Sequence, residues 1–159
     1  MTAPPATVDD TRRLAIVPVT AENWRRVYAV QVAEEQQAFV MPPGYYLALC
    51  AYGGLWQPLA IVHDGAVVGF MMWAVDPADG ACWLGGIQID RAQQRRGLGR
   101  QALVAALAML EQAHGFRHFA LSYQPANVAA ARLYAGLGFV ESGEWEDDEV
   151  VARLSRTAG

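Results

Sequence analysis

The chain has 159 residues, of which 53% are hydrophobic and 18% charged, a composition typical of one globular domain. Its formal net charge of −4 at pH 7 argues against a nucleic-acid-binding protein and suits a cationic partner. No run approaches the roughly 18 apolar residues that a membrane span needs, and the N-terminus lacks the basic and apolar regions of a signal peptide. We therefore expect a cytoplasmic protein with a frayed tail over residues 1–12 and one domain over residues 13–156.

Apolar runs and turn residues predict the elements of the first part of the chain. In order, they are a strand over 14–19, a helix capped by Thr20 and continuing to about Ala33, a connection over 36–44 that contains Pro42 and Pro43, and a helix over 45–52 closed by Gly53 and Gly54. In this interpretation Glu34 and Glu35 stand at the end of the first helix.

The same signals continue to the C-terminus. They predict strands over 58–63 and 66–74 joined by an Asp64-Gly65 turn, a strand over 81–90, a long helix over 98–114 stopped by Gly115, a strand over 118–123, a helix from its cap Asn127 to Leu137, and strands over 139–142 and 150–154 around an acidic loop. Antiparallel strands followed by a β-α-β-α-β order imply an α/β fold, with a mixed central sheet and helices on both faces.

The cysteines and histidines do not suggest a metal centre. Cys50 and Cys82 lack metal spacing, and His63, His114 and His118 form no ligand cluster along the sequence. We expect two reduced core thiols and no bound metal ion. Neither cysteine has a histidine partner in a recognisable motif, so no covalent nucleophile is expected.

A basic, glycine-containing turn connects the 81–90 strand to the long helix. It reads Gln94-Arg95-Arg96-Gly97-Leu98-Gly99-Arg100. The glycines allow a tight turn and close approach of a ligand. The helix start offers free N–H groups and the positive end of its dipole. Together these features predict a cradle for a pyrophosphate group.

Other phosphate-binding patterns fit this turn less well. The kinase-type phosphate loop G-x-x-x-x-G-K-[ST] is absent. Gly97, Gly99 and Ala102 satisfy the dinucleotide pattern G-x-G-x-x-A, but no acidic residue stands about 20 positions later, as that pattern requires. A basic helix cap without any ligand is the remaining alternative.

At these residues the sequence resembles the GNAT superfamily of acyl-CoA-dependent N-acetyltransferases. Gln94 to Gly99 match the family's Q/R-x-x-G-x-G/A motif, and Asn127 to Phe139 resemble its N-x-x-A-x-x-L-Y-x-x-x-G-F segment. The resemblance covers roughly Leu14 to Leu154 and implies the GNAT fold. It also implies acetyl-CoA as co-substrate, with direct transfer of the acetyl group to an amine.

The resemblance assigns roles residue by residue. Tyr134 would be the general acid toward coenzyme A, and Asn127 would contact the pantetheine arm. The backbone of Ile87, Gln88 and Ile89 would pair with the pantetheine amides as an added strand does. The pyrophosphate would be held by the cradle, namely Gln94, Arg95, Arg96, Gly97, Leu98, Gly99 and Arg100.

The acceptor is harder to assign. Glu35-Gln36-Gln37-Ala38-Phe39-Val40 resembles the E-Q-x-x-F-V stretch of the bacterial spermine/spermidine acetyltransferases within GNAT, so Glu35 is a candidate to position the amine or relay its proton. Pro42-Pro43 and Gly85-Gly86 depart from that branch and could reshape the acceptor pocket. Because glycines are unusual in a strand, Gly85-Gly86 are also expected to mark a bulge or the close approach of a ligand. The acidic residues of the last loop are expected to be solvated; they are Glu141, Glu144, Glu146, Asp147, Asp148 and Glu149.

The expected partner is thus a small-molecule amine, a polyamine or diamine among the candidates, with neither nucleic acid nor membrane, and a homodimer stays open. The alternatives are acetylation of an antibiotic or a peptide N-terminus by the same fold, and a non-catalytic acyl-CoA-binding sensor. The intact Tyr134 argues against the sensor.

Overall fold

The computed structural model describes residues 14–156, so the tail expected over residues 1–12 lies outside the described residues. The strands are β1 (Leu14–Pro18), β2 (Gln57–His63), β3 (Ala66–Val75), β4 (Cys82–Ile89), β5 (His118–Tyr123), β6 (Val140–Glu146) and β7 (Glu149–Ser155). The helices are α2 (Trp24–Tyr28), α3 (Pro43–Tyr52), α4 (Leu98–His114) and α5 (Val128–Gly136), with short 3-10 turns η1 (Glu34–Gln36) and η2 (Arg91–Gln93). None of the described helices is long and apolar enough to cross a membrane.

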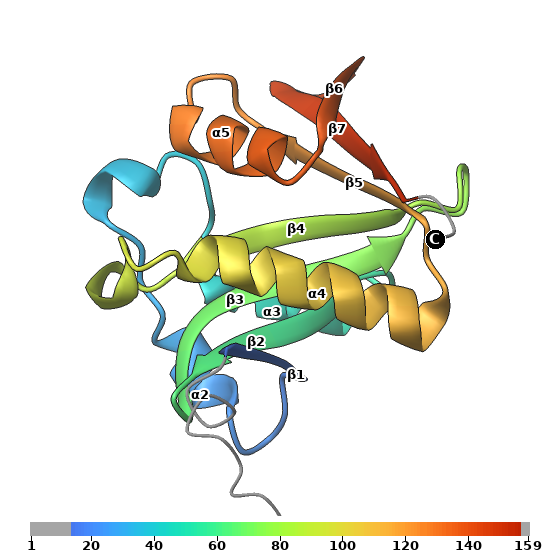
Figure 1. The fold of residues 1–159 in the computed structure, drawn as a ribbon. Helices are drawn as coiled ribbons and strands as arrows, with labels where there is room; N and C mark the ends of the chain where they lie inside the picture. The colour runs from blue at the N-terminus through green and yellow to red at the C-terminus, as the bar shows by residue number, and fades with distance from the viewer. Residues whose placement is uncertain (1–13, 157–159) are drawn as a thin grey trace, which may run out of the picture.

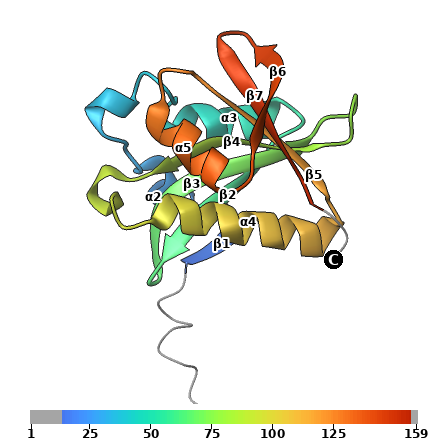
Figure 2. The same cartoon turned by 45° about the horizontal axis from the view of Figure 1, so that its top comes forward.

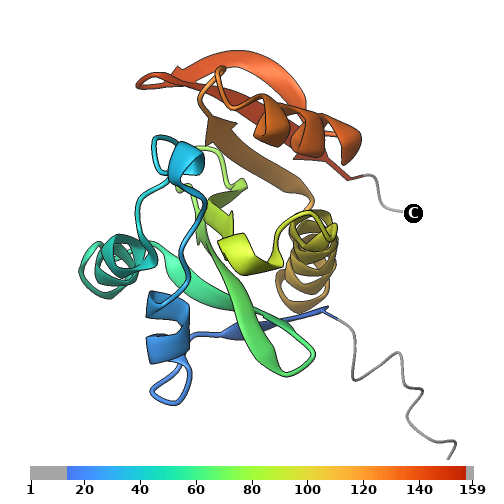
Figure 3. The ribbon, with the colours of Figure 1, turned by 90° about the vertical axis from the view of Figure 1, so that its left-hand side faces the viewer.

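The strands form one mixed sheet with helices on both faces (Figures 1 and 2), which confirms the expected fold class. Its order is β1-β2-β3-β4-β5-β7-β6, and only β4 and β5 are parallel neighbours. Helices α2 and α3 cover one face, and α4 covers the other with α5 beside it (Figure 3). Each face has its own apolar core, the larger one under α4 and α5.

Several elements lie at the residues that the local sequence pattern predicts. Helix α4 spans Leu98–His114 and is closed by Gly115, which has a φ of 73° in the left-handed region. Its residues Leu103, Leu107 and Leu110 are fully buried at helical spacing. Asp64 and Gly65, with φ of 52° and 77°, make the expected two-residue hairpin between β2 and β3.

The expected helix from Thr20 to Ala33 is wrong in its length. Helix α2 covers only Trp24–Tyr28, and the chain is irregular beyond it. Val30 and Val32 are both buried while Gln31 between them is exposed, the alternation of an extended segment. Gln31 is held by tertiary bonds, because its N–H donates to the Asp90 carboxylate at 2.9 Å and its carbonyl accepts from Arg91 at 2.8 Å.

Two further expectations need correction. Glu34 and Glu35 begin the 3-10 turn η1 and do not end a helix. The acidic loop is largely strand, because β6 runs to Glu146, β7 begins at Glu149, and only Asp147 and Asp148 lie between them. Every residue of β6 is exposed, so the strand shows no buried alternation by which the sequence could have indicated it.

Candidate active site

Strands β4 and β5 separate part-way along the sheet. They pair only at Cys82 with Phe119 and Trp83 with Ala120, and beyond that point they diverge (Figure 1). The edge of β4 from Leu84 to Ile89 therefore has no neighbouring strand on the β5 side. A cavity of about 1020 Å³ occupies this gap and is lined by residues from both faces of the sheet.

A bulge in β4 lies beside the gap. Gly85 pairs with Met72 and Gln88 with Phe70, so two β4 residues stand opposite Met71. Gly86 has a φ of 62°, and a Cβ added there would come within 3.0 Å of the Phe70 ring. The bulge expected from Gly85-Gly86 is thus confirmed, and a bulge bends its strand and disrupts regular pairing locally.

The turn before α4 has the form of an anion site. Gly97 is the N-cap residue with a φ of 73°, and Arg95 also has a positive φ, of 65°. The N–H groups of the first turn, at Leu98, Gly99 and Arg100, have no intrahelical acceptor. Arg95, Leu98 and Gly99 line the cavity. The turn therefore directs free N–H groups and one flexible cation toward the gap.

The other basic residues of the turn lie outside the cavity lining. Arg96 donates to the Gln93 side chain at 2.6 Å, and Arg100 reaches the Gly136 carbonyl at the end of α5 at 3.5 Å. Both side chains are exposed. Contact of either with a bound phosphate would require a different side-chain rotamer.

Gln94 holds the turn in place. Its Nε2 donates to the Ile89 carbonyl at 2.9 Å and to Gln36 Oε1 at 2.7 Å, while Gln36 Nε2 returns a bond of 3.0 Å. The amide pair joins the end of β4 to η1. Gln94 thus holds the cradle in position. Because the Ile89 carbonyl accepts from Gln94, it already has a hydrogen-bond partner.

The three β4 residues expected to meet the pantetheine arm all line the cavity. The side chains of Ile87 and Ile89 pack on the core under α4. Gln88 points to the other face, is only 5% exposed and donates to the Met41 and Gly86 carbonyls at 3.1 and 3.2 Å. Its amide nitrogen is therefore engaged within the protein, and the backbone of this segment stays open on the β5 side.

Helix α5 supplies Asn127 and Tyr134 from the side of α4. Asn127 Oδ1 accepts from the Ala130 N–H at 3.2 Å, which confirms the expected cap. Tyr134 is 8% exposed, lines the cavity and packs against the rings of Tyr123 and Phe139. Within residues 14–156 its hydroxyl has no hydrogen-bond partner. Burial, and then the nearby Glu149 carboxylate, raise the pKa of Tyr134 well above its ordinary value.

Tyr123 also lines the cavity, but its proton is already engaged. Its hydroxyl donates to Glu141 Oε1 at 2.9 Å. Burial, and then the Glu141 hydrogen bond, raise the pKa of this hydroxyl too. Of these two neighbouring tyrosines, Tyr134 is the one with a protonated and uncommitted hydroxyl at neutral pH.

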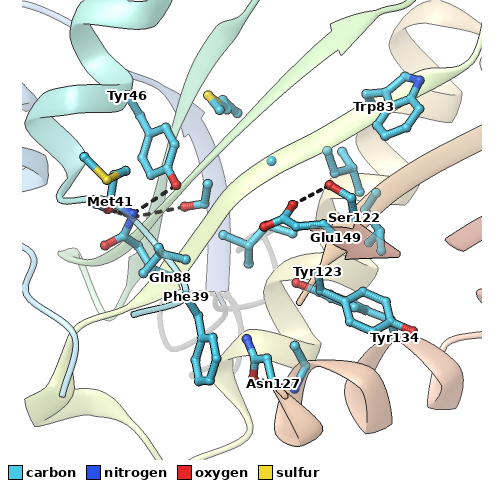
Figure 4. Close-up of a pocket in the computed structure, with 18 of the residues that line it drawn as sticks. Phe39, Met41, Tyr46, Trp83, Gln88, Ser122, Tyr123, Asn127, Tyr134 and Glu149 are labelled. Carbon is cyan, nitrogen blue, oxygen red and sulfur yellow. Dashed lines mark hydrogen bonds between the residues drawn. The ribbon is translucent and has the colours of Figure 1, made fainter. Parts of the chain in front are cut away.

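Glu149 is one of the carboxylates that the fold brings to the site. Side chains alternate along β7, and Val150 and Ala152 join the core under α4, so Glu149 faces the α3 side. Its Oε1 accepts from Ser122 Oγ at 2.7 Å. Figure 4 shows it between Tyr46 and Tyr134, and its charge raises the pKa of both. The sequence placed Glu149 only among solvated acids, since nothing local marks it.

Glu35 is not brought to this site. Its side chain is exposed and lies outside the cavity lining, whereas its neighbour Gln36 belongs to that lining. The stretch that resembles the polyamine branch thus contributes Gln36, Phe39 and Val40 to the cavity. Within residues 14–156, no three His, Cys, Asp or Glu side chains are grouped so as to hold a metal ion.

Comparison with known proteins identifies the family. The model of the acetyltransferase (GNAT) family matches residues 23–139, which contain the cradle, Asn127 and Tyr134. The chain belongs to the GNAT acetyltransferase family. As a GNAT-family N-acetyltransferase it is an enzyme, and the expectation drawn from its motifs is confirmed.

Relatives of this GNAT protein differ in their acceptors. It is 27% identical to a spermine/spermidine N(1)-acetyltransferase of Bacillus subtilis, over 81% of this chain and 89% of the relative. A spermidine N-acetyltransferase of Vibrio cholerae, solved with CoA and spermine, shares the fold at a TM-score of 0.70 and 14% identity, covering 89% and 94% of the two chains. An aminoglycoside acetyltransferase solved with CoA and kanamycin has a TM-score of 0.75 at 14% identity, covering 90% and 95%.

An ion-pair clasp holds the acidic hairpin of this acetyltransferase against β4. Arg153 on β7 donates to Asp79 and Glu144 at 2.9 Å each, and its guanidinium lies 5.5 Å from the centre of the Trp83 ring. The Arg153 hydrogen bond lowers the pKa of Glu144 below its ordinary 4.5. Trp83 and Glu149 both line the cavity, so the clasp joins the hairpin to a residue of the cavity wall.

We expect Glu144→Gln to lower Tm slightly at pH 7, because exposed ion pairs stabilise weakly. The folded pKa of Glu144 is depressed, so its contribution is present above pH 4.5 and is lost as pH falls through the folded pKa. The Tm difference between wild type and variant should therefore shrink below about pH 4. Glu146→Gln, two residues along the same strand, is the matched control. A Tm difference that grows on acidification would contradict the clasp.

Proposed function

We propose that this protein transfers the acetyl group of acetyl-CoA directly to the primary amine of a small molecule. The observation that carries the proposal is the gap between β4 and β5, which leaves a strand edge, a helix N-terminus and a free tyrosine hydroxyl around one cavity. Acetyl-CoA would reach that strand edge from the α4 side, and the amine would approach the bound thioester from the α3 side.

The residues present fit acetyl-CoA. The first-turn N–H groups of α4, with Gly97 in the left-handed conformation and Arg95 beside them, would hold the pyrophosphate. The free edge of β4 at Ile87 and Gln88 would pair with the amides of the pantetheine arm. Asn127 keeps its amide nitrogen available at the cavity wall while its oxygen caps α5.

The chemistry falls to Tyr134 and Glu149. The raised pKa of Tyr134 keeps its hydroxyl protonated, so it can donate a proton to the departing thiolate. Glu149 would hold the amine near the gap through its second carboxylate oxygen. A nearby anion raises the pKa of an amine, whereas apolar surroundings lower it, so the two effects oppose each other. Glu149 therefore positions the amine, and the apolar walls favour its neutral, reactive form, whose ammonium proton has left to solvent. The proton that the nitrogen loses after it attacks the thioester carbon replaces the one that Tyr134 gives to the thiolate.

A screen of amines for coenzyme A thiol release tests the proposal. The names of the relatives make spermine, spermidine and diamines the first acceptors to test, and aminoglycosides and peptide N-termini follow. We expect acetylation of at least one primary amine, with stoichiometric release of thiol. CoA binding without any turnover would favour the sensor instead.

Glu149→Gln should lower kcat/KM for the amine by about 10- to 100-fold, because a hydrogen bond to a charged group contributes about 1.5–3 kcal/mol. Glu35→Gln is the matched control and should leave kcat/KM near wild type, since Glu35 lies outside the cavity. Steady-state kinetics at saturating acetyl-CoA measures both. If Glu35→Gln strongly lowered kcat/KM while Glu149→Gln left it unchanged, Glu35 would be the residue that positions the amine.

A further inference from the structure

The α3 side of the cavity has a continuous apolar wall. A Cβ added at Gly85 would lie 3.2 Å from both the Met72 methyl group and the Trp56 ring, so these two side chains meet over the bare glycine. Tyr46 stacks on Phe70 beside the bulge, with ring centres 5.9 Å apart. Leu49, Ala74 and Trp83 continue the lining. The glycine lets these two side chains pack directly on β4, and a side chain at this position would push them outward.

The rim of the cavity on this side is apolar as well. Met41, Tyr45, Leu55 and Val75 are 46%, 52%, 57% and 37% exposed, and all four line the cavity. Gln57 and Trp73 pair in the β2–β3 register, and Leu55 and Val75 each lie two residues from this pair. Apolar side chains grouped at the rim of a cavity are typical of a ligand-binding groove.

Charge enters this side mainly through Glu149. The carboxylates Glu146, Asp147 and Asp148 also belong to the cavity rim, but they are exposed at the hairpin tip, where solvent screens them. Asp76 is engaged by its own turn, since it accepts from the Ala78 N–H at 2.9 Å. Asp76 and Glu149 are both half-buried, but Asp76 stands in the β3–β4 connection, whereas Glu149 lies beside the apolar wall. Glu149 and this wall match a ligand with an ammonium group and an apolar body.

We infer, resting on the proposed function, that the preferred acceptors are primary amines with a single ammonium group and an aromatic or branched aliphatic body. The ammonium lies at Glu149 and the body lies against Trp56, Met72 and Leu55. A linear polyamine has a second ammonium a few carbons from the first, and the apolar wall offers it no partner. Burying an unpaired charge is costly, so the wall disfavours polyamines.

The test compares 2-phenylethylamine with 1,4-diaminobutane and spermidine at saturating acetyl-CoA. We expect kcat/KM for 2-phenylethylamine to exceed that for 1,4-diaminobutane about tenfold or more, the discrimination that an apolar pocket supplies. Leu55→Asp adds a carboxylate to the wall and should reverse part of this preference, lowering the ratio about tenfold. Tyr52→Asp is the matched control, because Tyr52 is 91% exposed on α3 and lies outside the cavity lining.

A preference for diamines in the wild type, or equal changes in Leu55→Asp and Tyr52→Asp, would overturn the inference. Binding of 2-phenylethylamine, measured by the tryptophan fluorescence of the CoA-loaded protein, tests the inferred amine preference separately from the proposed function. If no amine is acetylated but Leu55→Asp still weakens this binding selectively, acetyl transfer is refuted and the amine preference holds. If 2-phenylethylamine neither binds nor reacts while another primary amine is acetylated, the amine preference is refuted and the proposed function holds.

Discussion

Tyr134→Phe is expected to reduce kcat about 10²- to 10⁴-fold, the contribution typical of a general acid. The variant keeps the ring and therefore its packing against Tyr123 and Phe139. Only the hydroxyl, which has no hydrogen-bond partner among residues 14–156, is lost. We expect the thermal midpoint to change little, so the loss of rate reports chemistry and not unfolding.

Tyr123→Phe is the control for this experiment. Tyr123 is as buried as Tyr134 and lies in the same cavity, but its hydroxyl donates to Glu141. Its removal should leave kcat near wild type at a small cost in stability. Because the pKa of Tyr134 is raised, its ionisation should cause no loss of activity up to about pH 10. Wild-type kcat in a folded Tyr134→Phe protein would show that Tyr134 is only part of the core.

Gly97→Val is expected to remove most of the stabilisation that coenzyme A confers. In the wild type, coenzyme A at a hundredfold excess over Kd should stabilise the protein by about 2.7 kcal/mol through mass action. Gly97 has a φ of 73°, which a β-branched residue adopts only with strain, so a valine there should distort the turn that presents the first N–H groups of α4. Thermal shift with and without coenzyme A measures the loss.

Gly115→Val separates strain from ligand binding. Gly115 closes the other end of the same helix at the same φ of 73°, and a Cβ added there would meet no atom within 4 Å. Each variant should lose about 1–2 kcal/mol or more of stability through its left-handed residue. Only Gly97→Val should lose the coenzyme A shift. Equal thermal shifts on addition of coenzyme A in wild type and Gly97→Val would show that the turn before α4 is a basic helix cap and not a phosphate site.

Features with a local cause could be predicted from the sequence. Helix α4, the Asp64-Gly65 hairpin and the Asn127 cap depend on residues within a few positions of one another, and each is present at the expected residues. The bulge at Gly85-Gly86 belongs here too, because glycines are unusual in a strand without such a reason. The resemblance of two ordered motifs, at the cradle and around Tyr134, then indicated the family.

Features with a distant cause could not be predicted. The first helix stops at Tyr28 because the segment after it is held by Asp90, about sixty residues away. Gln94 has the family's motif position, yet its amide is taken by Gln36 and Ile89. Glu35 and Glu149 are equally acidic in the sequence. Only the register of β5 against β7 turns Glu149 into the cavity beside Ser122.

The sequence by itself therefore determined the family, the mixed sheet and the glycine turn before α4, since backbone conformation and capping act over one or two turns of chain. The tertiary structure alone decided that Glu149 and not Glu35 lines the cavity, and which side chains form the cavity walls. Trp56, Met72 and Gly85 come from three different strands or loops, and they share one face only because side chains alternate along paired strands. A period of two is visible within each strand, but which residues face one another depends on pairing register, which no single segment encodes.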